Sequence, residues 1–556
     1  MKRFLIVVAL AAAFVSCRKS DAPDPAGPEA EADYTIIFWG MSGTNDFGVA
    51  VDLITVAENY VTGRTADNVQ IAGLVKTSVN LSDPSAEDFD RTYYFHSGDT
   101  EGKTLDLDSV DSNDVLDIYR NAFRILDGVP YADTTYALNN VDSLAAFISR
   151  TAEEFPAKNY VLMLLGHGGG FSPAEETPLT RACLYDNYKN GDYLTADAVV
   201  SAAEKSGVHI QTLFTQCCLM GTLENIAAYS KAFDYGFLAA EETYSYYFPE
   251  YLVKLSAAGS EEQKMQEASR ELVDYYVSTL ADSPDAYSTH GFYDLRQTSG
   301  LLSVVKDIAS WYSTNYPALQ QKIDDAVCNT IYCNNLKGEE TETLRKEREY
   351  LQALLNDDEG VLILIGEYTY EEYMMEIFDT MENLAYHSIS YGFPLAHLLS
   401  TTLSELTSDE SAFLSLKSLE QRYKSAIKDM AYIRANPVPE GATGDYEYLY
   451  CSPTINIFAM NEKYFTPILG SQETYDAFVV AVKNNDPDTS GKLLEEMFGG
   501  SIFANYVSLE QAELNYTSSV FDKAVGWSSF LKKLQTNPSV LYNPDRREID
   551  EMVFAL

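Results

Sequence analysis

Residues 159–170 read NYVLMLLGHGGG, and residues 211–221 read QTLFTQCCLMG. In each stretch a short apolar run leads to a reactive side chain and then to glycine. The reactive residue is His167 in the first stretch, and Cys217 and Cys218 stand at the same place in the second. A short apolar run bounded by turn residues is typical of a buried strand. We therefore predict two buried strands, each presenting a reactive side chain at its carboxyl end.

The segments around these two stretches alternate between strand and helix patterns. We expect strands at residues 34–40, 69–79, 91–95, 160–165, 212–217 and 235–240, and helices at 141–154, 195–206 and 223–232. This alternation predicts an α/β fold with a mostly parallel sheet flanked by helices. Sites in such sheets form outside the carboxyl ends of the strands, where His167 and Cys218 would both lie.

The composition limits the class of protein. The chain has 556 residues, of which 46% are hydrophobic and 40 are tyrosine, so a globular protein is expected rather than a disordered one. A formal net charge of −44 argues against nucleic acid and anionic lipid as partners. The seven cysteines show no spacing typical of a disulfide framework, which leaves room for a functional thiol.

The N-terminus has the pattern of an export signal. Lys2 and Arg3 precede an apolar run that ends at Ser16 and Cys17, and the run is too short to span a bilayer in the mature protein. A cysteine directly after a small residue resembles a bacterial lipobox, which implies cleavage before Cys17 and a lipid on its sulfur. We expect a protein anchored to the bacterial cell envelope, at the outer membrane; the alternative is an ordinary secretory signal with a chance cysteine.

The pair His167 and Cys218 suits peptide-bond hydrolysis. A thiolate is a strong nucleophile near neutral pH when an imidazolium lowers its pKa. The backbone N–H groups of Gly168 and Cys218 could form an oxyanion hole, since glycine lets the backbone approach a substrate closely. Buried cysteines are more often inert packing residues. Here, however, His167 precedes Cys218 by about 50 residues, as in caspase-like cysteine peptidases.

The motifs at both strand ends resemble those of the clostripain family of cysteine peptidases. Residues 167–171 (HGGGF) are similar to its histidine element, residues 218–221 (CLMG) with Glu224 to its nucleophile motif, and residues 239–242 (AAEE) to the stretch after its next strand. The resemblance implies a caspase-like fold related to gingipains and legumains. It also implies that Cys218 is the nucleophile and His167 the general acid/base.

Two departures from the family pattern stand next to the nucleophile. The cysteine is doubled, and because neighbours on a strand point to opposite faces, Cys217 is expected to face the core. The family usually has an aspartate two residues before the nucleophile, where it helps bind a basic P1 side chain, and this chain has Gln216. A neutral amide does not balance a buried cation, so the P1 preference is open. We assign Gln216, Glu241 and Glu242 to the substrate pocket.

Five regions are expected along the chain. They are a signal peptide at residues 1–17, a tether at 18–33, a caspase-like catalytic domain at 34–260, a mainly helical region or insertion at 261–440, and a C-terminal α/β segment at 441–556. The last segment should contain a strand at 448–460 and should pack on the catalytic domain, with Trp527, Phe530 and Leu531 as packing residues.

The expected function is that of an exported, lipid-anchored cysteine endopeptidase acting on proteins or peptides, with no metal and no cofactor. Calcium dependence occurs in the family, but the acidic clusters of this chain lack an EF-hand pattern. Arg181, in the polar loop between His167 and Cys218, is a candidate for self-cleavage. The alternative function is a catalytically inactive surface lipoprotein of the same fold that binds peptide or glycan.

Overall fold

The computed structural model describes the chain at residues 32–42, 68–77, 91–96, 140–168, 170–171, 183–186, 192–240, 248–280, 290–330, 393–434, 446–456 and 516–534, together with Leu514 and scattered positions between 477 and 489. The signal peptide, Cys17 and most of the tether lie outside these ranges. So do Arg181, Glu241 and Glu242, and the predictions made for all of them stay predictions.

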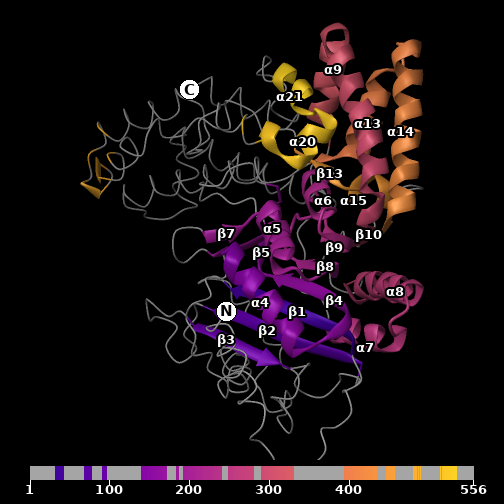
Figure 1. Ribbon diagram of the computed structural model, residues 1–556. Helices are drawn as coiled ribbons and strands as arrows, with labels where there is room; N and C mark the ends of the chain where they lie inside the picture. Colours follow the sequence, from indigo (N-terminus) through magenta and orange to yellow (C-terminus); the bar gives the residue numbers. More distant parts are fainter. Residues whose placement is uncertain are drawn as a thin grey trace, which may run out of the picture.

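The centre of the fold is an eight-stranded sheet in the order β12-β10-β9-β8-β4-β1-β2-β3 (Figure 1). Its strands along the chain are β1 (Ala32–Ser42), β2 (Val69–Thr77), β3 (Arg91–His96), β4 (Ala157–Leu165), β8 (Ile210–Gln216), β9 (Phe233–Ala239), β10 (His290–Asp294) and β12 (Ala431–Ile433). The neighbours from β2 to β9 pair in parallel. β3, β10 and β12 are antiparallel additions at the two edges. The six predicted strands are all present, which confirms the mostly parallel α/β fold.

Strand β4 illustrates why this sequence forms an interior strand. Val161, Leu162 and Met163 are consecutive and all have at most 1% of their surface exposed, so both faces of the strand are covered. A strand of a parallel sheet needs such an unbroken apolar run, because helices cover the sheet on both sides.

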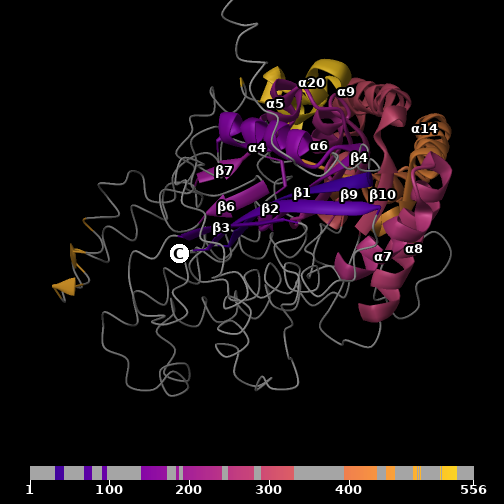
Figure 2. The same cartoon turned by 60° about the horizontal axis from the view of Figure 1, so that its bottom comes forward.

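Helices cover both faces of the sheet (Figure 2). On one side lie α4 (Val141–Glu154), α5 (Ala196–Ser206) and α6 (Leu223–Tyr229), and on the other α7 (Phe248–Ala258) and α8 (Glu262–Leu280). Trp39 of β1 packs on Phe147 of α4, with ring centroids 5.5 Å apart. On the opposite face Phe214 of β8 packs on Tyr251 of α7 at 5.1 Å. Alternate strand residues thus supply two separate apolar layers.

Helix α5 begins and ends as its sequence predicts. The Thr195 hydroxyl accepts the N–H of Ala198 at 3.1 Å, which caps the first turn. Gly207 follows the last turn with φ of 70°, a left-handed conformation that glycine adopts without steric cost. This helix fixes where the chain re-enters the sheet as β8.

The region expected to be mainly helical also completes the sheet. It contains η2 (Leu295–Gln297), α9 (Thr298–Asn329), α13 (Leu395–Glu405) and α14 (Glu410–Met430), and the last three pack side by side (Figure 1). It also supplies β10 and β12, which the sequence did not predict. β12 has only three residues and directly follows α14, so no alternating pattern could develop.

The predicted strand at residues 448–460 is wrong in its first part. The chain there forms α15 (Tyr446–Cys451), and within the described residues 446–456 the extended segment is β13 (Thr454–Ile455), paired with β11 (Phe393–Pro394). Tyr448 turns its ring onto Tyr423 of α14, with centroids 6.2 Å apart, so the apolar residues serve a helix contact. Proline disfavours helical conformation in the residue before it, and the helix ends ahead of Pro453.

The C-terminal helices α20 (Val520–Val525) and α21 (Ser528–Leu534) pack against α9. Trp527 lies between them, fully buried, with its ring 5.9 Å from Tyr312 and 5.0 Å from Phe530. The predicted packing role of Trp527, Phe530 and Leu531 is confirmed, since each is at most 1% exposed. None of the helices in the described ranges has both the length and the apolarity that crossing a bilayer requires.

Candidate active site

The stretches at residues 159–170 and 211–221 leave the sheet side by side. β4 and β8 are parallel neighbours in a register that pairs Leu165 with Gln216. The N–H of Gly166 donates to the carbonyl of Gln216 at 3.4 Å, just beyond the end of β4. The histidine loop (residues 166–171) and the cysteine loop (residues 217–222) therefore start from the same edge of the sheet. The predicted convergence of the two strand ends is confirmed.

The histidine loop opens with a short strand that joins a second sheet. β5 (His167–Gly168) pairs with β6 (Cys183–Asp186), and β6 pairs with β7 (Asp192–Leu194). His167 stands opposite Tyr185 in this three-stranded sheet. The loop is thereby held at two points, by β4 on one side and by β6 on the other.

Gly168 brings the backbones of the two loops into direct contact. A Cβ atom built at this position would lie 2.2 Å from the carbonyl oxygen of Cys218, 2.6 Å from its nitrogen and 2.8 Å from the Cβ of Cys217. Distances below 3.0 Å are closer than real Cβ contacts. Only glycine fits here, and the residue that follows His167 lies against the peptide unit of Cys218.

The two adjacent cysteines have different surroundings. Cys217 is fully buried in the main core, and its thiol donates to the carbonyl of Leu164 on β4, with the two atoms 3.8 Å apart. Cys218 is half-buried. Neither cysteine is in a disulfide. The expectation that Cys217 faces the core is confirmed, although the strand ends at Gln216 and both cysteines lie in the turn that follows.

The backbone of the cysteine loop is constrained immediately after the nucleophile candidate. Leu219 has φ of 62°, the one positive value for a non-glycine residue in the described ranges. Such conformations persist only where the surroundings fix them, and they are frequent at functional sites. Here Gly221 donates its N–H to the carbonyl of Ala239 at the end of β9, and its carbonyl accepts the N–H of Thr454 at 3.2 Å. Thr222 then caps α6 through its hydroxyl, 3.0 Å from the Asn225 nitrogen.

Gln216 has an amide that finds no hydrogen-bond partner among the residues that the structure describes. The residue is only 6% exposed, and both amide atoms are buried. Phe214 lies two residues earlier on β8 and packs against Tyr251, so alternation places Gln216 on the α7 face of the sheet. A buried amide without hydrogen bonds lowers the stability of the protein unless another group forms hydrogen bonds with it.

Glu224 links the cysteine loop to the C-terminal part of the chain. It lies in the first turn of α6, is 1% exposed, and accepts the N–H of Asn456 at 3.0 Å and the hydroxyl of Tyr516 at 3.2 Å, both at Oε1. The sequence drew attention to Glu224 through the nucleophile motif. It gave no signal for Asn456 or Tyr516, because contacts so distant in sequence leave no local pattern.

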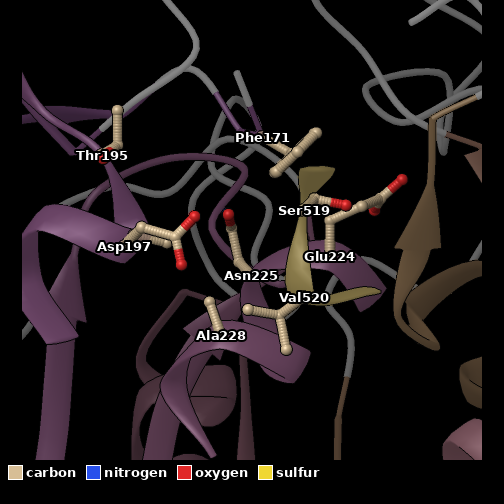
Figure 3. Close-up of a pocket in the computed structure, with 9 residues that line it drawn as sticks. Phe171, Thr195, Asp197, Glu224, Asn225, Ala228, Ser519 and Val520 are labelled. Atoms are coloured by element: carbon tan, nitrogen blue, oxygen red, sulfur yellow. The ribbon is translucent and has the colours of Figure 1, made fainter. Parts of the chain in front are cut away.

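A small open hollow lies beside this link (Figure 3). It is formed where the histidine loop, α5, α6 and the start of α20 meet, and Figure 3 shows Asn225 between Asp197 and Glu224. Its lining residues are Phe171, Thr195, Ala196, Asp197, Glu224, Asn225, Ala228, Ser519 and Val520. Among the described residues no group of three or more histidine, cysteine or carboxylate side chains is placed to hold a metal ion.

The mostly parallel sheet, with helices on both faces, defines an α/β protein. The sequence model of the clostripain family, a peptidase family, matches residues 110–390, about half of the chain. The chain belongs to the clostripain family of cysteine peptidases.

Three solved structures are similar to parts of this chain. A secreted C11 cysteine protease from Bacteroides thetaiotaomicron, iotapain, is 15% identical over 50% of this chain and 70% of its own, with a TM-score of 0.35. A secreted C11 cysteine protease from the same organism, in complex with an irreversible peptide inhibitor, is 11% identical over 72% and 84%, with a TM-score of 0.41. An inactive zymogen C11 protease from Parabacteroides distasonis is 15% identical over 50% and 66%, with a TM-score of 0.33. No curated protein matches the chain.

Proposed function

We propose that this protein is an exported cysteine endopeptidase in which Cys218 and His167 form the catalytic dyad. The observation that carries the proposal is the contact at Gly168, since the residue after His167 lies against the backbone of Cys218. Cys218 is also the more accessible of the two adjacent thiols. Family membership supplies the reaction class.

The proposed reaction has two steps. The Cys218 thiolate attacks the scissile carbonyl carbon, and the tetrahedral oxyanion accepts hydrogen bonds from the N–H groups of Gly168 and Cys218. The C–N bond breaks as the His167 imidazolium gives its proton to the leaving amine. His167 then takes a proton from water, the hydroxide displaces the thiolate, and the acid product leaves. Such a nucleophile and its base split one difficult displacement into two easier ones.

The experiment that tests this function is cleavage of a fluorogenic peptide library randomised at P1, with and without calcium. Cleavage that disappears in Cys218→Ala would support the proposal. Absence of cleavage by the wild type, combined with Cys218 alkylation by iodoacetamide no faster than that of an ordinary thiol, would favour the inactive lipoprotein that binds peptide or glycan. Fast alkylation without cleavage would point to a zymogen awaiting a cut.

We also propose that Gln216 lines the pocket for the P1 side chain, together with Glu241 and Glu242. The support is its position two residues before Cys218 and its buried amide, unpartnered among the described residues, which a P1 side chain with a hydrogen-bonding group would complete. A neutral amide offers a buried arginine or lysine no counter-charge. The Gln216 amide therefore favours an uncharged polar P1 residue, whereas a basic P1 residue would depend on Glu241 and Glu242 for its counter-charge.

The Gln216→Asp variant is expected to change this preference towards basic side chains. The ratio of kcat/KM for P1 arginine to that for P1 glutamine should rise by about 100-fold, because the new carboxylate adds a counter-charge for arginine and removes the amide that bonds glutamine. Gln211→Asp is the matched control, since Gln211 lies near the other end of the same strand, and its ratio should not change. Equal ratios in wild type and Gln216→Asp would remove Gln216 from the P1 pocket.

Two further proposals concern maturation. The lipobox-like sequence ending at Cys17 supports a lipid anchor at the outer membrane. The Cys17→Ser variant should then leave the membrane fraction and lose the mass of the acyl groups; an unchanged distribution would contradict the anchor.

Arg181 lies in the polar loop between the dyad residues and is the proposed self-cleavage site. On a denaturing gel the wild-type protein should appear as two fragments, and the Cys218→Ala variant as one uncut chain. A wild-type protein that is active but uncut would exclude cleavage at Arg181.

A further inference from the structure

Tyr516 contacts Phe171 at the end of the histidine loop and Glu224 on α6, the helix that follows the cysteine loop, although it is 292 residues from Glu224 in the chain. Its side chain is fully buried. We infer that Tyr516 is a positioning residue that holds the histidine loop against the cysteine loop, an inference that rests on the proposed Cys218–His167 dyad. It acts through Glu224 on one side and through Phe171 on the other.

The contact on the cysteine side runs through helix α6. The Tyr516 hydroxyl donates to Oε1 of Glu224 at 3.2 Å, and this carboxylate also accepts the N–H of Asn456 at 3.0 Å. Glu224 stands two residues after Thr222, the last residue of the cysteine loop and the N-cap of α6. The carboxylate is 1% exposed, so these bonds form in a medium of low dielectric constant, where they are strong.

The contact on the histidine side is aromatic. Tyr516 meets the ring of Phe171 edge to face, with centroids 5.8 Å apart and planes at 81°. This geometry is the favourable one for two aromatic rings. Phe171 follows Gly170, where an added Cβ would lie 3.4 Å from the Leu219 carbonyl oxygen. The histidine loop thus rests on the cysteine loop at Gly168 and Gly170, and Tyr516 touches the far end of it.

The hydroxyl of Tyr516 stays protonated and keeps donating. Burial, together with the nearby Glu224 carboxylate, raises the pKa of the Tyr516 hydroxyl well above its ordinary value. The hydroxyl is therefore the donor in its hydrogen bond to the Glu224 carboxylate.

The segment that carries Tyr516 is itself anchored. The N–H of Ser519 donates to the Tyr516 carbonyl at 3.0 Å, and the Ser519 hydroxyl caps α20. The indole N–H of Trp527 donates to the carbonyl of Asn456 at 3.2 Å, which ties the same segment to Glu224 a second time. Figure 3 shows Ser519 and Glu224 on one side of the hollow, below Phe171. The C-terminal helices on α9 therefore provide a fixed base from which Tyr516 holds both loops.

The test uses the full chain and compares Tyr516→Phe with Tyr312→Phe. Both changes remove one buried hydroxyl that has a hydrogen bond. Tyr312 bonds Thr402 of α13 at 2.8 Å, and its ring packs on Trp527 and Phe530. Tyr516→Phe should lower kcat by about fivefold to tenfold with KM nearly unchanged, because small displacements of reacting groups reduce the rate strongly. Tyr312→Phe should keep both constants. Tyr516→Ala, which also removes the ring contact with Phe171, should lower kcat further than Tyr516→Phe does.

A second readout needs no substrate. The rate of Cys218 alkylation by iodoacetamide is followed against pH, as the difference between each variant and the same variant carrying Cys218→Ala. The midpoint of this rate-against-pH curve is the apparent pKa of the Cys218 thiol. In Tyr516→Ala this pKa should rise towards the ordinary thiol value of about 8.5, because the proposed His167–Cys218 dyad is no longer held together. Loss of stability alone does not move this midpoint in the folded protein. Glu224→Gln keeps an acceptor oxygen and should retain most activity, whereas Glu224→Ala should behave like Tyr516→Phe.

The outcomes separate the inference from the proposed function. Wild-type cleavage with unchanged kcat and midpoint in Tyr516→Phe and Tyr516→Ala would overturn the inference and leave the peptidase intact. Equal losses in the Tyr516→Phe and Tyr312→Phe variants would also overturn it, since Tyr516 would then be only a stability residue. A shifted midpoint in a protein that cleaves nothing would support the inference against the proposed function. A wild-type Cys218 as slow as an ordinary thiol would overturn both.

Discussion

The Cys218→Ala variant is expected to cleave peptides with kcat/KM at least about 10⁴-fold below wild type, because the nucleophile is removed and only transition-state binding remains. Cys218 is half-buried and lies in the turn directly after β8, at the carboxyl edge of the sheet. The measurement is the initial rate on the best P1 substrate, with titration by an irreversible thiol reagent to count active sites. Folding is checked by thermal unfolding of both proteins.

Cys217→Ala is the matched control, because it makes the same change one residue away. The Cys217 thiol is fully buried and donates to Leu164, so its removal should lower the free energy of unfolding by about 1–2 kcal/mol. Activity should stay within about threefold of wild type, since this thiol has no access to a substrate. The reverse pattern, with Cys217→Ala inactive and Cys218→Ala active, would reassign the nucleophile.

Gly168→Ala is the second large effect. The new Cβ would lie 2.2 Å from the Cys218 carbonyl oxygen and 2.6 Å from its nitrogen, and backbone atoms cannot give way as a flexible side chain does. The two loops must separate. We expect kcat/KM to fall by at least about 100-fold. The free energy of unfolding should fall by about 1–3 kcal/mol, the usual cost of overpacking.

Gly300→Ala provides the comparison for this change. Gly300 lies near the start of α9, and a Cβ built there meets nothing within 4 Å. Alanine is the better helix former, so stability should be equal or higher by up to about 1 kcal/mol, with wild-type activity. Urea unfolding of both variants measures the change in stability, and peptide-cleavage kinetics measure the change in kcat/KM. A fully active Gly168→Ala would mean that the histidine loop does not rest on Cys218.

Much of the fold follows from local sequence. The apolar runs that became β1, β4, β8 and β9 are interior strands of a parallel sheet, and such strands need an unbroken apolar sequence. Thr195 and Gly207 predicted the ends of α5 because capping is decided within one turn of helix. The difference between Cys217 and Cys218 was also open to sequence reasoning, because it depends on residues that are neighbours in the chain.

Other features depended on the assembled structure. The chain at residues 446–451 became a helix because Tyr448 found a partner in α14, and β10 and β12 became strands because the sheet had free edges to extend. The proposed roles of Arg181, Glu241 and Glu242 rest on the sequence alone, since those residues lie outside the described ranges.

The sequence by itself determined which strands end in reactive side chains, because that pattern is written within a dozen residues. Only the tertiary structure placed Gly168 against Cys218, left the Gln216 amide without a partner among the described residues and brought Tyr516 to Glu224. Strand propensity, capping and turns are settled by a few consecutive residues. A hydrogen bond between residues 292 apart is settled by how complete helices and sheets pack, and no short stretch of sequence carries that information.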